Sequence, residues 1–205
     1  MKFQPLLAIA LLVATVSSGS AKSTSENKQR SRLQILHTLE LENIQLTLVE
    51  RAYLDTFMML QSSNQCGRFF GGSGSRFVLD ELVAQLRQQT IPDSRIGVRM
   101  SGTFITRVAP QDGISYRLFE RAELNTLGAF YRAKTFASEP RVPKMGSFAP
   151  NTRQARVMIL LHELAHMIQG PDGNWLIPDD GDNPLLSRSN TWTIEAQCGA
   201  QIRAL

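Results

Sequence analysis

Several features that would assign this 205-residue chain to a particular class of protein are scarce or absent. It has no internal repeat, no low-complexity tract after residue 21, and no cluster or stripe of basic residues despite a net charge of +4. Nucleic-acid binding needs such a cluster or stripe, so nucleic acid is not an expected partner. The hydrophobic fraction of 42% and the charged fraction of 20% are ordinary for a soluble globular protein, which argues against a disordered chain and a multi-span membrane protein.

Long apolar runs are confined to the start of the chain. Lys2 supplies a positive charge, residues 6–16 are almost entirely apolar, and residues 17–21 are small. These three parts are typical of a secretory signal peptide that is cleaved after Ala21. The apolar run is too short to cross a ~30 Å hydrocarbon core as a helix, and no cysteine follows it to carry a lipid. We therefore expect no stable membrane insertion after cleavage.

The remaining length suits one domain with a hydrophobic core and is too short for two. We expect a signal peptide over residues 1–21, a polar and flexible lead-in over 22–38, and a single domain over 39–205. The processed protein is expected to be secreted or periplasmic, and monomeric.

Cysteine is rare, and the predicted export determines how its two positions are interpreted. Cys66 and Cys198 are the only cysteines, and thiols outside the cytosol tend to pair. A bridge between them would tie the early part of the chain to its C-terminal end, with a stabilisation of ~4 kcal/mol in a chain-entropy picture. Cysteine ligation of zinc is the alternative, which two isolated cysteines without a second close pair fit poorly.

Hydrophobic spacing predicts a mixture of helices and strands. The segments expected are a strand at 39–48, helices at 49–60 and 77–89 with Pro92 ending the second, a glycine-rich loop at 64–75, strands at 96–108, 114–119 and 127–136, an extended connection at 140–150, and a helix at 190–202.

Residues 153–169 form the clearest helix of the sequence. They contain neither glycine nor proline, Asn151 and Thr152 are both suitable N-caps, and Gly170 followed by Pro171 ends the segment. Residues 157–161 are continuously apolar, which predicts burial on more than one face. Just after this apolar run, the same buried helix carries three polar residues that require an explanation.

These three polar residues are His162, Glu163 and His166. The spacing of four between the histidines places both imidazoles on one face of the helix, where they can bind one zinc ion at ~2.0–2.1 Å each. Glu163 follows the first histidine directly and is placed to accept a proton from a water molecule activated by the metal. The alternative is a pair of core histidines hydrogen-bonded to the backbone, with Glu163 on the surface.

The segment His162-Glu163-Leu164-Ala165-His166 is a His-Glu-x-x-His motif and resembles the zincin metallopeptidases. The resemblance implies a zinc-dependent hydrolase of peptide bonds in which His162 and His166 bind the metal and Glu163 is the general base. It also implies a zincin-like α+β fold, with the active-site helix packed against a small mixed or antiparallel sheet. The strands expected between residues 96 and 136 would supply an edge for an extended peptide substrate.

A third protein ligand to the zinc is required, and His37 lies too far upstream to be expected there. Asp172 stands ten residues after the first histidine, where metzincin-like enzymes have a ligand, although Gln169 occupies the position of their glycine. Glu195 resembles the glutamate ligand of the thermolysin-like group, although Gly199 stands where that group has an aspartate.

The turn at residues 178–182 offers a further carboxylate. The stretch from there to Cys198 resembles a group of small uncharacterised bacterial secreted zincin-like proteins, which have a pair like Asp180-Gly181 near the active-site helix. Pro178 and Gly181 also favour a tight turn that would hold a short side chain. We place Asp180 first as the third ligand, with Glu195 and Asp172 as alternatives. Asp179 and Asp182 would then point elsewhere or contact the histidines.

These observations predict an exported zinc peptidase that cleaves a peptide or protein substrate, with Zn²⁺ as its cofactor. Two alternatives are a non-catalytic zinc-binding domain that recognises a peptide or wall component, and a disulfide-tied extracellular binding domain in which the motif is accidental. Glu163 argues against the first, because binding alone has no use for a base.

Overall fold

The computed structural model describes residues 48–87, 90–91, 97–110, 112–133 and 142–205. The expected signal peptide at 1–21, the lead-in at 22–38 and Pro92 lie outside these residues, as does the strand expected at 39–48 apart from its last residue. Within the part described, no helix is both long enough and apolar enough to cross a membrane.

The described residues combine helices with a small sheet, which makes the fold α+β as the sequence predicts. The elements in chain order are α2 (Leu48–Gln61), α3 (Gln65–Phe69), α4 (Gly74–Leu86), β1 (Thr90–Ile91), β2 (Val98–Val108), β3 (Ser115–Asn125), α5 (Arg153–Met167) and α6 (Pro184–Arg203).

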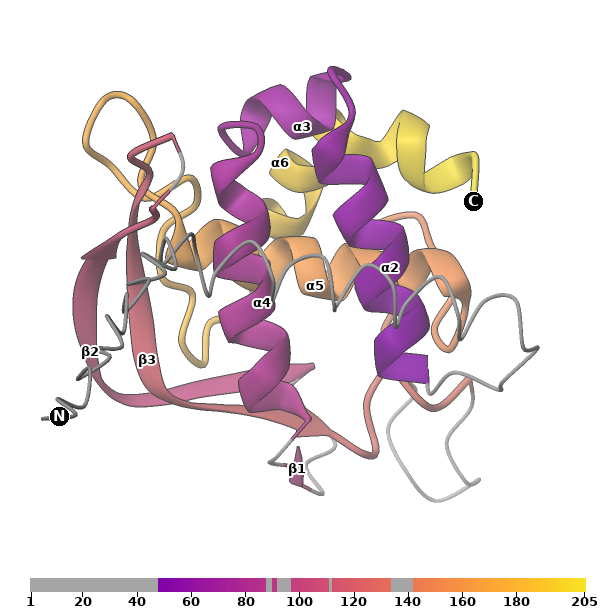
Figure 1. Ribbon diagram of the computed structural model, residues 1–205. Coiled ribbons are helices and arrows are strands. Elements are labelled where there is room, and N and C mark those ends of the chain that lie inside the picture. The colour runs from indigo at the N-terminus through magenta and orange to yellow at the C-terminus, as the bar shows by residue number, and fades with distance from the viewer. Residues whose placement is uncertain (1–47, 88–89, 92–96, 111, 134–141) are drawn as a thin grey trace, which may run out of the picture. The chain divides into compact units, whose positions relative to one another are not determined.

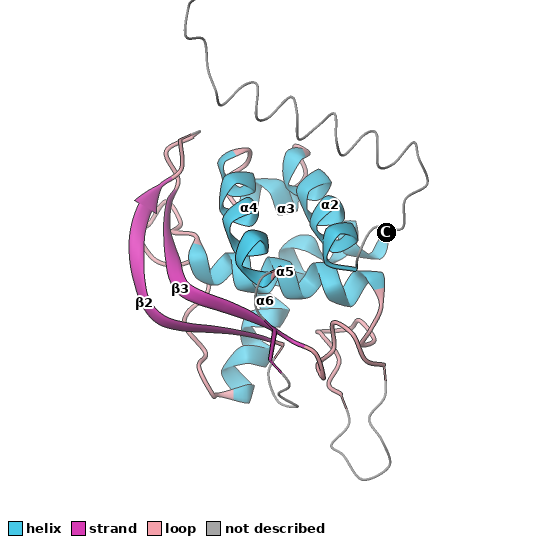
Figure 2. Cartoon of the chain, turned by 60° about the horizontal axis from the view of Figure 1, so that its bottom comes forward, coloured by secondary structure: helices cyan, strands magenta, loops and turns pink. Residues whose placement is uncertain are grey.

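The sheet is mixed and has the strand order β1-β3-β2. Two residues of β1 pair parallel to the end of β3, while β2 and β3 form a long antiparallel hairpin, which curves beside the helices in Figures 1 and 2. The pairing of the hairpin is irregular between Ser101 and Phe104, where Gly102 has a φ of 84°. A glycine at such an irregularity is common, because it adopts the positive φ that one type of bulge requires.

Helix α5 lies in the middle of the core. Every residue from Val157 to Met167 is buried, so the prediction of burial on more than one face is confirmed. The helix packs against α2 and α6, whereas α4 covers β3. The C-terminal end of α5 meets the sheet, where Ile168 forms a β-bridge with Tyr116 of β3.

Local hydrogen bonds explain where α5 begins and ends. The hydroxyl of Thr152 accepts from the N–H of Ala155, which makes Thr152 the N-cap. The helix ends at Met167, two residues before the predicted end, because Ile168 turns extended and forms a β-bridge with Tyr116 of β3. The end of the helix is thus fixed by the sheet before the Gly170-Pro171 signal is reached.

The prediction of a loop over residues 64–75 is wrong for most of that segment. Asn64 caps the short helix α3 by accepting from the N–H of Gly67, and α4 already begins at Gly74. Residues 70–73 make the turn between the two helices, and Gly71 and Gly72 supply its positive φ values of 85° and 77°. The glycine content indicated a loop, but the cap and the close packing of Gly67 against the carbonyl of Ser62 favour a helix.

The strand predicted at 127–136 is also absent from the described part, residues 127–133, which forms turns. The side chain of Asn125 accepts from the N–H of Leu127 and turns the chain directly after β3. Phe130 is fully buried, and its carbonyl accepts from Arg156 of α5. The aromatic residues that indicated a strand therefore pack as a buried turn.

A disulfide joins Cys66 of α3 to Cys198 of α6, as the sequence predicts. The two cysteines are 132 residues apart in the sequence, and both are fully buried. The bridge therefore connects the N-terminal helices to the last helix of the chain.

Reduction of this disulfide should lower the free energy of unfolding by about 4 kcal/mol, because the unfolded chain regains the entropy of a long closed loop. Urea unfolding with and without a thiol reductant measures the difference. The double variant Cys66→Ala/Cys198→Ala is the control, since reductant should not affect it. Equal stability of the wild-type protein in both conditions would contradict the prediction.

Candidate metal centre

Three potential metal ligands converge at the C-terminal half of α5. His162 and His166 come from that helix and Asp180 from the turn after it, and one ligand atom from each lies within 4.8 Å of the others. Both histidines are buried, and the side chain of Asp180 is 16% exposed. The structure thus brings together the two motif histidines and the carboxylate placed first in the sequence analysis.

The distances within this group can be compared with those that a metal ion requires. His162 Nε2 lies 3.1 Å from His166 Nε2 and 3.2 Å from Asp180 Oδ2, and His166 Nε2 lies 3.6 Å from Asp180 Oδ1. Ligands at 2.0–2.1 Å from a tetrahedral zinc ion are about 3.3 Å apart. The spacing of the three side chains therefore fits three corners of a zinc site.

Thr191 of α6 determines the tautomer of His162. Its hydroxyl donates to the carbonyl of Ser187 at 2.9 Å and lies 3.1 Å from His162 Nδ1. Because its single proton is used on Ser187, the hydroxyl accepts from Nδ1–H of His162. The neutral ring then has its lone pair on Nε2, the atom that points into the group of three.

The turn that carries Asp180 is fixed to α6. The side chain of Asn190 donates to the carbonyl of Pro178 at 2.8 Å, and the N–H of Asn183 donates to the carbonyl of Asp180 at 2.8 Å. Gly181 has a φ of 46°, a value that most other residues avoid. The turn chemistry of Pro178 and Gly181 indicated a tight turn, and α6 holds that turn next to α5.

Glu163 is buried beside the group, with 9% of its surface exposed. Burial raises its pKa to about 7; His162 opposes the increase, and the charge of Asp180 adds to it. No described residue donates a hydrogen bond to its carboxylate. A carboxyl group with a pKa close to neutrality can both accept and return a proton at physiological pH.

Asp180 has the opposite electrostatic environment. Burial alone would raise its pKa, but hydrogen bonds and charges from His162 and His166 outweigh burial and hold the pKa well below its usual range. The two carboxyl groups therefore differ in protonation near neutral pH, with Asp180 ionised and Glu163 able to exchange a proton.

The alternative third ligands lie outside this group. Glu195 accepts from the N–H of Ser147 at 2.9 Å and from its hydroxyl, and Arg203 lies 3.4 Å away. Asp172 is exposed and accepts from the backbone and side chain of Asn174. Glu195 therefore fastens the loop before α5 to α6, and Asp172 shapes its own turn.

Sequence reasoning did not identify Arg117 or Thr191 as parts of the site. Arg117 of β3 is 2% exposed, and it donates to the carbonyl of His166 and to the carboxylate of Asp179. A charged residue in the middle of a predicted strand was the available signal for Arg117. Thr191 lies one helical turn before Glu195, on the buried face of α6, and no local pattern distinguishes it.

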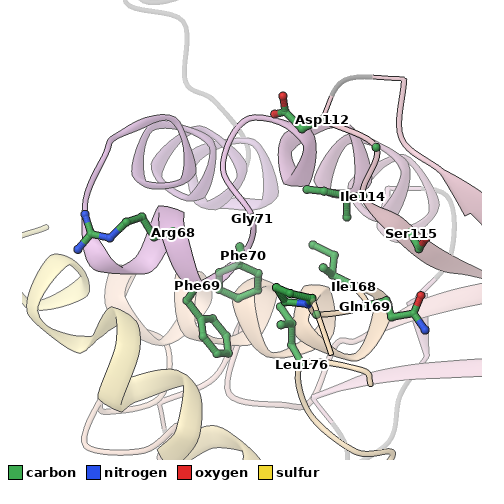
Figure 3. Close-up of a pocket in the computed structure, with 13 residues that line it drawn as sticks. Arg68, Phe69, Phe70, Gly71, Asp112, Ile114, Ser115, Ile168, Gln169 and Leu176 are labelled. Atoms are coloured by element: carbon green, nitrogen blue, oxygen red, sulfur yellow. The ribbon is translucent and has the colours of Figure 1, made fainter. Parts of the chain in front are cut away.

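A cavity of about 340 Å³ lies near the C-terminal end of α5, lined by residues that include Phe70, Ile114 and Ile168. In Figure 3 these three side chains approach one another from three separate segments. None of His162, Glu163, His166 and Asp180 lines this cavity. The cavity is therefore distinct from the candidate metal centre.

Glu195→Gln should lower the free energy of unfolding by roughly 1–3 kcal/mol, because the carboxamide keeps one acceptor oxygen and places an NH2 group against the other donor of Ser147 in a buried position. Its affinity for divalent metal should stay at the wild-type value. Urea unfolding and chelator competition measure the two properties, with Asp172→Asn as an exposed control that changes neither. Much weaker metal binding by Glu195→Gln would instead make Glu195 a ligand.

Comparisons of this chain with known proteins found no matching family model, no matching curated protein and no matching solved structure, so the candidate function depends on the geometry of the site and on the motif.

Proposed function

We propose that this protein is an exported zinc-dependent peptidase of the zincin type. The observation that carries the proposal is the convergence of His162, His166 and Asp180 at the spacing of a tetrahedral zinc site, with buried Glu163 next to the first histidine. A pair of core histidines would need no carboxylate from a separate turn.

The donor set suits a catalytic zinc rather than a structural one. Three protein ligands leave one coordination position open, whereas structural sites use four. Two neutral imidazoles and one carboxylate also leave a net positive charge on a divalent ion. Zinc bound there would lower the pKa of a bound water to ~7 and polarise the carbonyl of the scissile bond.

The side chains of the chain have separate roles in this proposal. Thr191 keeps the lone pair of His162 on Nε2, and Asp180 remains ionised. Glu163 accepts a proton from the attacking water and returns it to the amine of the leaving peptide. Its raised pKa, close to 7, suits both transfers near neutral pH.

The sheet offers a place for an extended substrate. β2 is the outer strand in the order β1-β3-β2, and no described strand pairs with its second edge. An extended peptide can add to such an edge through backbone hydrogen bonds. The exposed side chains of Phe104, Ile105 and Val108 on β2 would then contact the side chains of the peptide.

Export is part of the same proposal. A disulfide is typical of proteins that fold outside the cytosol, and the apolar start of the sequence is typical of a signal peptide. The periplasm and the external medium both meet this condition.

The exported protein should bind one zinc ion per chain, and Asp180→Ala should weaken binding far beyond the ~10–100-fold loss that supporting residues cause. Elemental analysis after dialysis gives the stoichiometry, and competition with a chelator gives the affinity. Asp172→Ala is the control carboxylate and should bind as the wild type does. Wild-type protein without zinc, or Asp180→Ala with normal affinity, would contradict the assignment.

Glu163→Gln should slow the hydrolysis of peptide bonds by at least ~10²–10⁴-fold and leave zinc bound. The substitution removes the general base and keeps all three proposed zinc ligands. Cleavage of a casein or peptide-library substrate is compared with that of wild-type protein, with and without chelator. A variant that binds zinc and cleaves at the wild-type rate would exclude Glu163 as the base. Wild-type protein that binds zinc and cleaves nothing would favour the non-catalytic zinc-binding alternative.

A further inference from the structure

Arg117 is a buried positive charge whose side-chain hydrogen bonds lead to residues at the candidate metal centre. Its side chain is 2% exposed, and its Nε donates to the carbonyl of His166 at 2.7 Å. The guanidinium group lies 4.5 Å from the ring centre of Trp175, with Phe104 and Phe119 also close. Such a charge requires a partner, because its burial unpaired would be costly.

Asp179 is that partner. Both of its carboxylate oxygens accept from the two terminal nitrogens of Arg117, the contact to Oδ2 being 2.9 Å. This bidentate geometry fixes the orientation of the carboxylate. Asp179 precedes Asp180 directly, so the residue held by the sheet is the neighbour of the proposed zinc ligand.

The two histidines differ in the hydrogen-bond partner of Nδ1, the ring nitrogen that faces away from the proposed metal position. Nδ1 of His162 contacts Thr191, whereas Nδ1 of His166 is buried and has no hydrogen-bond partner among the described residues. Asp179 Oδ1 lies 3.9 Å from that nitrogen. If Nε2 of His166 binds a metal ion, Nδ1 carries the proton, and a buried N–H without an acceptor is unfavourable by ~1–3 kcal/mol.

Asp179 can accept this proton without releasing Arg117. Each carboxylate oxygen has two lone pairs, and the contact to Arg117 uses one of those on Oδ1. The second remains for Nδ1–H of His166, at a distance that a small rotation of either side chain would shorten. Arg117 also donates to the backbone carbonyl of His166. One side chain therefore holds both Asp179 and the histidine that it would contact.

We propose that Asp179 is a positioning residue that accepts Nδ1–H of His166 when its Nε2 binds zinc, and that Arg117 holds it for that role. The inference rests on the proposed zinc site. It gives the turn at 178–182 two functions: Asp180 binds the metal, and Asp179 sets the tautomer of a histidine that binds it.

The test compares Asp179→Ala and Asp179→Asn with Asp182→Ala in the exported, disulfide-bonded protein. Asp182 is an exposed carboxylate of the same turn, so its removal changes the charge equally and keeps the proposed acceptor. Zn²⁺ affinity, measured by chelator competition, should fall ~10–100-fold in Asp179→Ala and stay unchanged in Asp182→Ala. Asp179→Asn retains an acceptor oxygen and a similar shape, and it should fall between the two.

The ring nitrogens of His166 provide a readout that a purely structural role of Asp179 would not change. The chain has three histidines, so nitrogen-15 NMR with a His37→Gln background resolves the two of interest. In the zinc-bound protein, the Nδ1–H group of His166 should show the nitrogen and proton chemical shifts of a hydrogen bond to a carboxylate in the wild type, and these shifts should change in Asp179→Ala. His162 should not change in any variant.

Equal zinc affinity in Asp179→Ala and Asp182→Ala would overturn the inference, and so would chemical shifts of the His166 Nδ1–H group that are the same in wild-type protein and in Asp179→Ala. Wild-type protein that binds no zinc is a different failure. It would remove the proposed function and this inference together, whereas equal zinc affinity in the two variants would remove the inference alone.

Discussion

The buried guanidinium group of Arg117 is the interaction on which the arrangement of the site depends. It joins three separate parts of the chain: strand β3, the C-terminal end of α5 and the turn at 178–182. A carbonyl and a carboxylate both accept from it, and three aromatic rings shield it. Since a buried charge must keep its partner, any movement of the turn away from β3 would be unfavourable.

Helix α6 supplies the opposite wall through three buried polar residues. Asn190 holds the turn, Thr191 contacts His162, and Glu195 holds the loop before α5. All three are buried, and Thr191 and Glu195 lie one turn apart while Asn190 points to the side, so a single helix contacts three neighbours. Buried apolar residues of the same helix, among them Ile194 and Ile202, anchor it in the core. Polar contacts are thus positioned by apolar packing around them.

Local sequence was sufficient for the parts of the fold that local chemistry determines. Helix α5 followed from the cap at Thr152 and from the absence of glycine and proline over the next turns. The same reasoning failed at Phe130, because an aromatic residue is equally suited to a strand and to a buried turn, and the side chain of Asn125 decided between them.

The site could be predicted only in part for a similar reason. The motif histidines are one turn apart on one helix, so their meeting requires no long-range information. Asp180 was one of three carboxylates that chain distance alone could not separate. Its position depends on two contacts of the neighbouring turn residues. Arg117 contacts Asp179 across 62 residues of sequence, and Asn190 contacts Pro178 across 12 residues. Such contacts exist only once the sheet and α6 are in place.

The disulfide between Cys66 and Cys198 has a topological consequence for the proposed peptidase activity. It closes a covalent ring that contains α4, the sheet, α5 and the turn, and therefore all of His162, Glu163, His166 and Asp180. A single backbone cut between the two cysteines opens this ring but separates no fragment from the rest. The nicked molecule would keep its mass, apart from one added water, until the bridge is reduced. Self-cleavage within the ring would therefore be invisible on a non-reducing gel.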